Sequence, residues 1–156
     1  MAFVLDASIT ACWAFPDEDH PDASRAFDQM RTGEAVVPSL WWFEVRNILV
    51  VNERRRRIAE SDTAAFLVNL SRLRIRVDRD PEEGAVLRLA RTHRLSVYDA
   101  AYLELAQRNG VPLATLDADL QKAAAVEGVA LLSRGDVAAA PSQTRIRGTV
   151  RAALPR

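Results

Sequence analysis

Four acidic residues interrupt apolar stretches of the sequence and are the first candidates for chemistry. They are Asp6, Glu44, Asp99 and Asp117. An unpaired carboxylate is costly to bury, so each needs a compensating partner. These neighbourhoods hold too few basic residues to pair all four. A shared divalent cation would compensate them, because hard cations bind carboxylate oxygens.

Three of these acids also have a structural interpretation when considered singly. Asp6 follows a strand-like run and precedes a helix, where an aspartate is a common cap. Asp99 completes a capping box that begins at Ser96. Glu44 lies on an apolar helix stripe, so it faces either the core, as part of a buried salt bridge, or a cleft. Arg46 is two residues away and points elsewhere on a helix, so we do not expect it to pair with Glu44.

The segment around Asp117 offers a fourth acid and two neighbours with suitable oxygens. Asp117 and Asp119 lie at a strand-to-helix turn, where one should cap the helix while the other points into the cleft. Thr115 could add a hydroxyl to the same site. Glu104 serves as a contrast, because its spacing pairs it with Arg108 on a helix face that we expect to be solvated. Taken together, four acids in apolar contexts are hard to explain by caps alone.

Alternating strand and helix patterns must position these acids. The predicted strands are 3–5, 35–37, 75–77, 111–115 and 129–132, and the predicted helices are 7–15, 21–30, 39–57, 61–73, 81–93, 96–109 and 118–126. Ser39 and Asp80 are the expected caps of the third and fifth helices. Such alternation predicts an α/β three-layer sandwich with a mostly parallel central sheet. Ligands bind beyond the carboxyl ends of such strands, where Asp6 and Asp117 lie.

Composition predicts one soluble domain over residues 1–137, followed by a flexible basic tail at 138–156. Lys+Arg and Asp+Glu balance at 21 each, so no net field draws the chain toward nucleic acid. No apolar stretch approaches the ~20 residues of a membrane span, and no basic segment precedes Phe3, which argues against a secretory signal. Cys12 is the single cysteine. The chain therefore cannot form an internal disulfide, which fits a reducing compartment. We therefore expect a cytoplasmic protein without membrane contact.

Several segments together resemble the motifs of PIN-domain nucleases. They are Val4-Leu5-Asp6-Ala7-Ser8, Glu44 on a helix, Val97-Tyr98-Asp99-Ala100-Ala101-Tyr102 and Ala114-Thr115-Leu116-Asp117-Ala118-Asp119-Leu120. The size of the chain is similar to that of the toxin ribonucleases of VapBC toxin–antitoxin modules. The likeness covers about residues 1–133, and the basic tail falls outside it.

This resemblance implies a function and a set of site residues. Asp6, Glu44, Asp99 and Asp117 would be the catalytic and metal-binding acids, with Asp119 as a further ligand and Thr115 as a secondary member. Mg²⁺ or Mn²⁺ would be the cofactor, and the activity would be endoribonucleolytic cleavage by a metal-activated water. The implied partners are an RNA substrate and a small antitoxin protein.

Two other classes of function stay open at this point. One is a phosphatase of the haloacid-dehalogenase type with Asp6 as nucleophile, although that chemistry normally wants an acid where Ser8 stands. The other is a PIN-like binding module without activity. His20 and His93 lie at helix ends, where we expect them to be exposed, so a zinc site is not predicted.

Two clusters remain outside the acidic motifs. The run 54–57 is all arginine and is interpreted first as a solvated helix end, with a patch that guides RNA as the alternative. The aromatic run Trp41-Trp42-Phe43 exceeds what one helix face can bury. Part of it should form an exposed patch for a partner, either an antitoxin or a second copy of the chain in a homodimer.

Overall fold

A four-stranded parallel sheet forms the centre of the computed structural model, which describes residues 1–132. Its strands are β1 (Ala2–Leu5), β2 (Glu34–Pro38), β3 (Ile75–Asp78) and β4 (Leu113–Ala114). They lie in the order β3-β2-β1-β4, and every pairing is parallel. The predicted basic tail at 138–156, and residues 133–137 of the predicted domain, lie outside the described residues.

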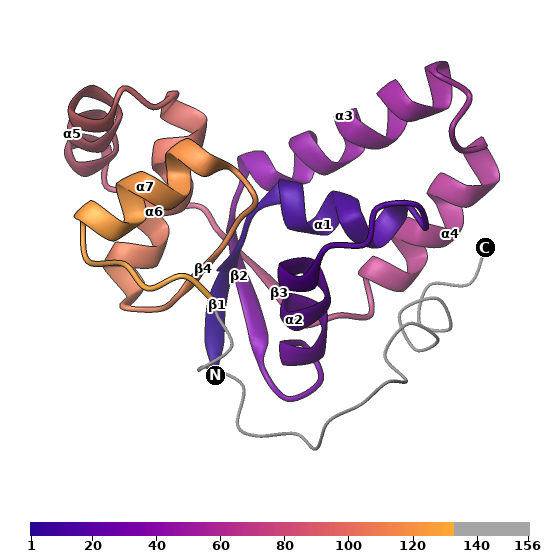
Figure 1. Cartoon of the computed structure of the whole chain (residues 1–156), viewed down its shortest axis with the longest axis horizontal. Helices are drawn as coiled ribbons and strands as arrows, with labels where there is room; N and C mark the ends of the chain where they lie inside the picture. Colours follow the sequence, from indigo (N-terminus) through magenta and orange to yellow (C-terminus); the bar gives the residue numbers. More distant parts are fainter. Residues whose placement is uncertain (133–156) are drawn as a thin grey trace.

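Helices cover both faces of the sheet (Figure 1). On one side lie α1 (Ala7–Ala14), α2 (Pro21–Gln29), α3 (Leu40–Arg54) and α4 (Glu60–Leu70). On the other lie α5 (Glu83–His93), α6 (Val97–Asn109) and α7 (Ala118–Val126). The predicted α/β three-layer sandwich is therefore confirmed. Within residues 1–132, no helix combines the length and apolar character that a bilayer span requires.

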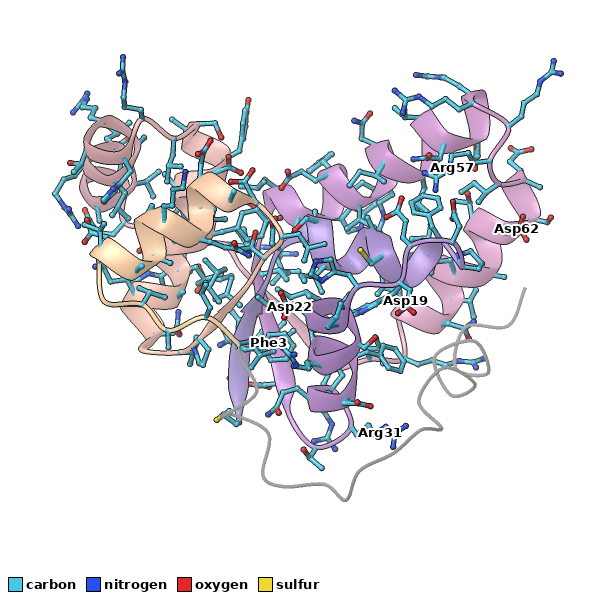
Figure 2. All side chains as sticks on the ribbon, viewed as in Figure 1. Phe3, Asp19, Asp22, Arg31, Arg57 and Asp62 are labelled. Atoms are coloured by element: carbon cyan, nitrogen blue, oxygen red, sulfur yellow. The ribbon has the colours of Figure 1, made fainter. Side chains whose placement is uncertain are left out.

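The core explains why the central elements form where they do. Phe3, Val4 and Leu5 of β1 are fully buried, as a central parallel strand covered on both faces requires. Figure 2 shows Phe3 inside this layered centre. In α6, every residue from Ala100 to Ala106 is buried. The first predicted strand and the sixth predicted helix are thus the buried elements on which the site is built.

Three predicted details are wrong at the ends of elements. Helix α5 begins at Glu83, because the Glu82 carboxylate, rather than Asp80, accepts hydrogen bonds from the first-turn N–H groups. Ser39 makes no side-chain cap bond to α3. That helix ends at Arg54, short of Arg57, whose guanidinium turns back to pair with two acids of the α1–α2 connection.

The last predicted strand, 129–132, is reduced to one bridge. Leu131 pairs in parallel with Leu113 of β4, and no strand continues from it within residues 1–132. The bridge covers the outer edge of β4.

Candidate active site

The site begins where β1 and β4 end side by side. Their register pairs Leu5 with Ala114, and the Asp6 N–H donates to the Ala114 carbonyl at 3.0 Å. The residue after each strand therefore lies beside its counterpart. The Thr115 hydroxyl donates to Oδ2 of Asp6 at 2.6 Å. The Thr115 hydroxyl therefore lies beside the Asp6 carboxylate.

A second hydroxyl holds the same carboxylate oxygen. The Ser8 hydroxyl donates to Oδ2 of Asp6 at 2.7 Å. Each hydroxyl accepts a backbone N–H, from Leu116 to Ser8 at 3.0 Å and from Asp117 to Thr115 at 3.1 Å. These N–H groups orient the hydroxyl oxygens, so both protons are directed to Asp6. Asp6 stands at the N-cap position of α1, but its side chain makes no cap bond to that helix.

Glu44 reaches the site from the first turns of α3. The buried Tyr102 hydroxyl of α6 donates to its Oε1 at 2.7 Å. One turn earlier, the indole N–H of Trp41 donates to the Thr10 hydroxyl at 3.0 Å, and that hydroxyl donates to the Asp6 carbonyl at 3.3 Å. These bonds fix α3 against both α1 and α6. The Tyr102 phenol is the partner of Glu44, and within residues 1–132 Glu44 does not form the buried salt bridge considered for it.

The other three acids come from the starts of α6 and α7. The Ser96 hydroxyl caps α6 by accepting the Asp99 N–H at 3.0 Å, and the Asp99 side chain is half-buried. Asp117 caps α7 by accepting the Leu120 N–H at 2.8 Å. Asp119 is exposed in the first turn of that helix. Of the two acids at this turn, Asp117 is therefore the cap.

The charges of the acids raise one another's pKa values. Burial raises the pKa of Asp6, hydrogen bonds from Thr115 and Ser8 oppose the rise, and the charge of Asp117 adds to it. Burial also raises the pKa of Glu44, against the Tyr102 hydrogen bond and with the charges of Asp6 and Asp99.

Asp99 is affected by the charges of three other acids of the site. Burial raises its pKa, and the charges of Asp117, Asp6 and Asp119 raise it further. Carboxylates that raise one another's pKa in this way repel when ionised. The fold thus holds the predicted acids together against their own repulsion.

No basic side chain of residues 1–132 pairs with these acids to relieve their repulsion. Within residues 1–132, none of the five carboxylates forms an ion pair with Lys, Arg or His. In the same part of the chain, no three His, Cys, Asp or Glu side chains are arranged as the direct ligand set of one metal ion. The donors suit a hard cation chemically, but they form a convergent group and not a closed ligand shell.

Glu104 corrects one expectation. It was expected on a solvated face, but it is only 2% exposed. It pairs with Arg108 at 2.6 Å, as its spacing predicted, and Arg108 also bonds Asp78 at the end of β3 at 2.9 Å. Helix α6 packs between the sheet and α5, and this packing covers the helix face that was expected to be exposed to solvent. Glu104 is therefore a structural acid.

This burial gives a first prediction. We expect Glu104→Gln to lower the free energy of unfolding by about 1.5–3 kcal/mol, because a charge-assisted bond to Arg108 is lost. The acids of the site are untouched, so the turnover of the folded fraction should be unchanged. Urea unfolding measures the free energy of unfolding. Activity measured at a temperature well below the unfolding transition gives the turnover. A lowered kcat in fully folded Glu104→Gln protein would place this acid in the site instead.

Sequence reasoning missed three supporting residues and misjudged a fourth. Tyr102, Ser8 and Thr10 hold the site acids, and only Tyr102 carried a signal, the i,i+3 spacing from Asp99. His93 was expected to be exposed, but its side chain is 10% exposed and its Nε2 lies 2.7 Å from Glu127. That pair joins α5 to the end of α7.

The fold and the site define a class: α/β proteins whose parallel sheet gathers carboxylates at its carboxyl edge. The chain belongs to the PIN domain family, whose sequence profile matches residues 3–126. It is 34% identical over 124 residues to Ribonuclease VapC3 of Pyrobaculum aerophilum, covering 77% of this chain and 92% of that protein. The fold is similar to the crystal structure of PAE2754 from Pyrobaculum aerophilum, with a TM-score of 0.63 and 22% identity, over 79% of this chain and 84% of that one.

Proposed function

We propose that this protein is a metal-dependent endoribonuclease and the toxin of a type II toxin–antitoxin pair. The observation that carries the proposal is the group of five carboxylates, without a basic partner in residues 1–132, at the carboxyl edge of the sheet. The similarity to Ribonuclease VapC3 supports RNA as the substrate.

The donor set favours Mg²⁺ or Mn²⁺ as cofactor. Asp6, Glu44, Asp99, Asp117 and Asp119 would hold the ion, in part through water, because magnesium usually retains several waters. When bound, such an ion stabilises the charge that develops on phosphorus and lowers the pKa of a coordinated water. It would also relieve the repulsion that raises the pKa values of Asp6, Glu44 and Asp99.

The chain's own residues prepare this chemistry by orienting the acids. Ser8 and Thr115 both donate to one oxygen of Asp6, which fixes the carboxylate and favours its ionised form. Tyr102 does the same for Glu44. Direct attack of water on phosphorus would break the bond to the 3′ oxygen and leave a 3′-hydroxyl and a 5′-phosphate.

One experiment separates this function from its two alternatives. The protein is incubated with RNA, and separately with a phosphomonoester, each with Mg²⁺, Mn²⁺ or EDTA. We expect RNA cleavage with either metal, 5′-phosphate ends, and no cleavage in EDTA. Hydrolysis of the phosphomonoester alone would favour the haloacid-dehalogenase type, although Ser8 occupies the place of its second acid. Binding of RNA without cleavage under all conditions would favour an inactive binding module.

The proposal extends to a small antitoxin partner that places a basic side chain among the acids. A guanidinium donates two parallel hydrogen bonds to a carboxylate and would supply the charge that the site lacks. Co-expression with a small adjacent gene, followed by cleavage assays across a Mg²⁺ titration, tests this. A complex that remains fully active at all Mg²⁺ concentrations would rule it out.

A further inference from the structure

Glu127 lies at the C-terminal end of α7, and its carboxylate binds side chains from two other helices. Nε2 of His93 in α5 lies 2.7 Å from Oε1 of Glu127, and Arg88 of the same helix donates to that oxygen at 3.2 Å. Gln107 of α6 donates to Oε2 at 3.1 Å. Because an ionised carboxylate only accepts hydrogen bonds, Nε2 of His93 carries the proton. These four residues, the Glu127 cluster, join α5 to the C-terminal ends of α6 and α7.

The Glu127 cluster is largely shielded from solvent. The side chains of His93 and Glu127 are only 10% and 15% exposed. The hydrogen bond from His93 is the largest of the effects that lower the pKa of Glu127 to about 2, with those from Arg88 and Gln107 behind it, although desolvation opposes the change. Three donors on one carboxylate fix its position more firmly than a single exposed ion pair would.

Apolar packing by itself constrains α7 only weakly. The buried residues of this helix are Leu120, Ala123 and Ala124. Two of them are alanines, whose methyl groups bury little apolar surface. At the first turn of α7, the Gln121 amide donates to the Thr115 carbonyl at 2.9 Å. The Glu127 cluster is the corresponding polar attachment at the last turn, so the direction of the helix depends on it.

Helices α6 and α7 carry site acids at the ends opposite the Glu127 cluster. Asp99 lies in the first turn of α6, 8 residues before Gln107, and Asp117 is the N-cap of α7, 10 residues before Glu127. These separations correspond to about 12 Å and 15 Å along the helix axes. The two helices pack against each other and run in the same direction (Figure 1). A change in the angle between them at the cluster therefore moves the acids at the other end.

We propose that Glu127 is a positioning residue, which sets the separation between Asp99 and Asp117 by holding the far ends of α6 and α7 together. It lies outside the acidic group and acts only through these helices. The inference rests on the proposed metal-dependent function and adds to it a residue remote from the acids. A displacement of about 1 Å at a reacting group can cost about 100-fold, so a small change of helix angle should weaken metal binding.

Magnesium binding by the full chain tests this role without measuring cleavage. Isothermal titration calorimetry gives Kd for the wild type, Glu127→Gln and Gln107→Ala. We expect Glu127→Gln to raise Kd for Mg²⁺ about tenfold, because its uncharged amide binds His93 and Arg88 less strongly. Gln107→Ala removes only the bond between α6 and α7, from an exposed side chain, and should raise Kd about threefold.

Glu104→Gln is the matched control. Glu104 is also a buried acid bonded to an arginine, but its bonds go to Arg108 of α6 and to the Glu82 N–H at the start of α5. Glu104→Gln should lower the melting temperature as Glu127→Gln does, yet leave Kd for Mg²⁺ within about twofold of wild type. An equal loss of Mg²⁺ affinity in both variants would show that any destabilisation weakens the metal site, and the positioning role would be wrong.

A metal-free comparison gives a second readout. In EDTA, Asp99→Asn should raise the melting temperature of the otherwise wild-type chain, because the charge of Asp117 no longer repels a charge at that position. In the Glu127→Gln background, the same substitution should raise it by less than half as much, because the acids are then further apart. An equal increase in both backgrounds would contradict the positioning role.

The outcomes distinguish this inference from the proposed function. Unchanged Mg²⁺ affinity in Glu127→Gln and Gln107→Ala, with normal RNA cleavage by the wild type, would overturn the positioning role and leave the ribonuclease standing. A wild type that binds Mg²⁺ but never cleaves RNA, with weaker Mg²⁺ binding in both variants, would retain the role and remove the ribonuclease. If the wild type binds neither Mg²⁺ nor Mn²⁺, the proposed function fails and the comparison in EDTA decides the role of Glu127. If Glu127→Gln does not fold, Gln107→Ala decides it in both measurements.

Discussion

Asp6→Asn should reduce RNA cleavage by about 1000-fold, which corresponds to about 4 kcal/mol of lost transition-state stabilisation. Asp6 is the most buried of the five acids, at 6% exposure, and two hydroxyls are committed to it. The asparagine keeps the shape and an oxygen that accepts both hydroxyl protons, but it removes the charge that would hold a cation. Initial rates with a labelled RNA across a Mg²⁺ titration measure the effect.

The same variant should remain folded. A buried carboxylate with a raised pKa is unfavourable when ionised, so its replacement by a neutral amide should not lower the melting temperature in EDTA. Asp28→Asn is the matched control, because Asp28 is also partly buried and pairs with Arg31 at 3.6 Å, at the opposite end of the molecule from the carboxyl edge (Figure 2). Near-wild-type activity of Asp6→Asn, or an equal loss in Asp28→Asn, would contradict the assignment.

Metal binding should change stability through Asp99, which gives the second large effect. Mg²⁺ at about 100 times its Kd should stabilise the wild type by about 2.7 kcal/mol, or roughly 5–10 °C in melting temperature. Asp99→Asn should have a higher melting temperature than wild type in EDTA. The substitution removes the charge of Asp99, which is repelled by the charges of Asp117, Asp6 and Asp119. It should also show less than half of the wild-type response to Mg²⁺. Differential scanning fluorimetry in EDTA and Mg²⁺ measures both shifts.

The variant Asp62→Asn is a control that distinguishes loss of charge repulsion from loss of a helix cap. Asp62 occupies the third position of α4, as Asp99 does in α6, and its carboxylate accepts the Ala59 N–H at 3.0 Å. It lies on the other side of the molecule from α6 (Figures 1 and 2). Loss of such a cap costs about 1 kcal/mol, so this variant should melt lower with an unchanged Mg²⁺ response. If Asp99→Asn behaves like Asp62→Asn, Asp99 is a cap and not a site residue.

The pH dependence of stability follows from the same acids. Because the pKa values of Asp6, Glu44 and Asp99 are raised on folding, the folded state binds their protons more tightly than the unfolded chain. In EDTA, their contribution to stability is present below the usual carboxyl pKa of about 4 and is lost as pH rises through the folded values. Glu127 has a pKa lowered to about 2, so its contribution to stability has the opposite pH dependence. That contribution is fully present above the usual glutamate pKa. Melting temperature in EDTA should therefore fall as pH rises above about 4.5, and less steeply in Asp99→Asn.

The order of elements and the acids at the chain's turns could be predicted from the amino-acid sequence. These features are local: the apolar run 3–5 is followed at once by Asp6, and Gly110 ends α6 with a positive φ of 62°. The PIN-like motifs add specificity because they combine several such local signals in a fixed order. Exposure of part of the run Trp41-Trp42-Phe43 was also predictable, since adjacent helical residues cannot share one face.

Which helical acids lie at the site depends on packing between distant segments of the chain. Glu44 and Glu104 both lie in apolar helical sequence, and helical periodicity assigns each a face without saying what covers it. Glu44 meets Tyr102, 58 residues away, whereas Glu104 pairs with Arg108, which is held in turn by Asp78. Likewise, the register of β1 and β4 brings Thr115 to Asp6 across 109 residues. Such partners are set by packing between distant segments, and no local spacing encodes them.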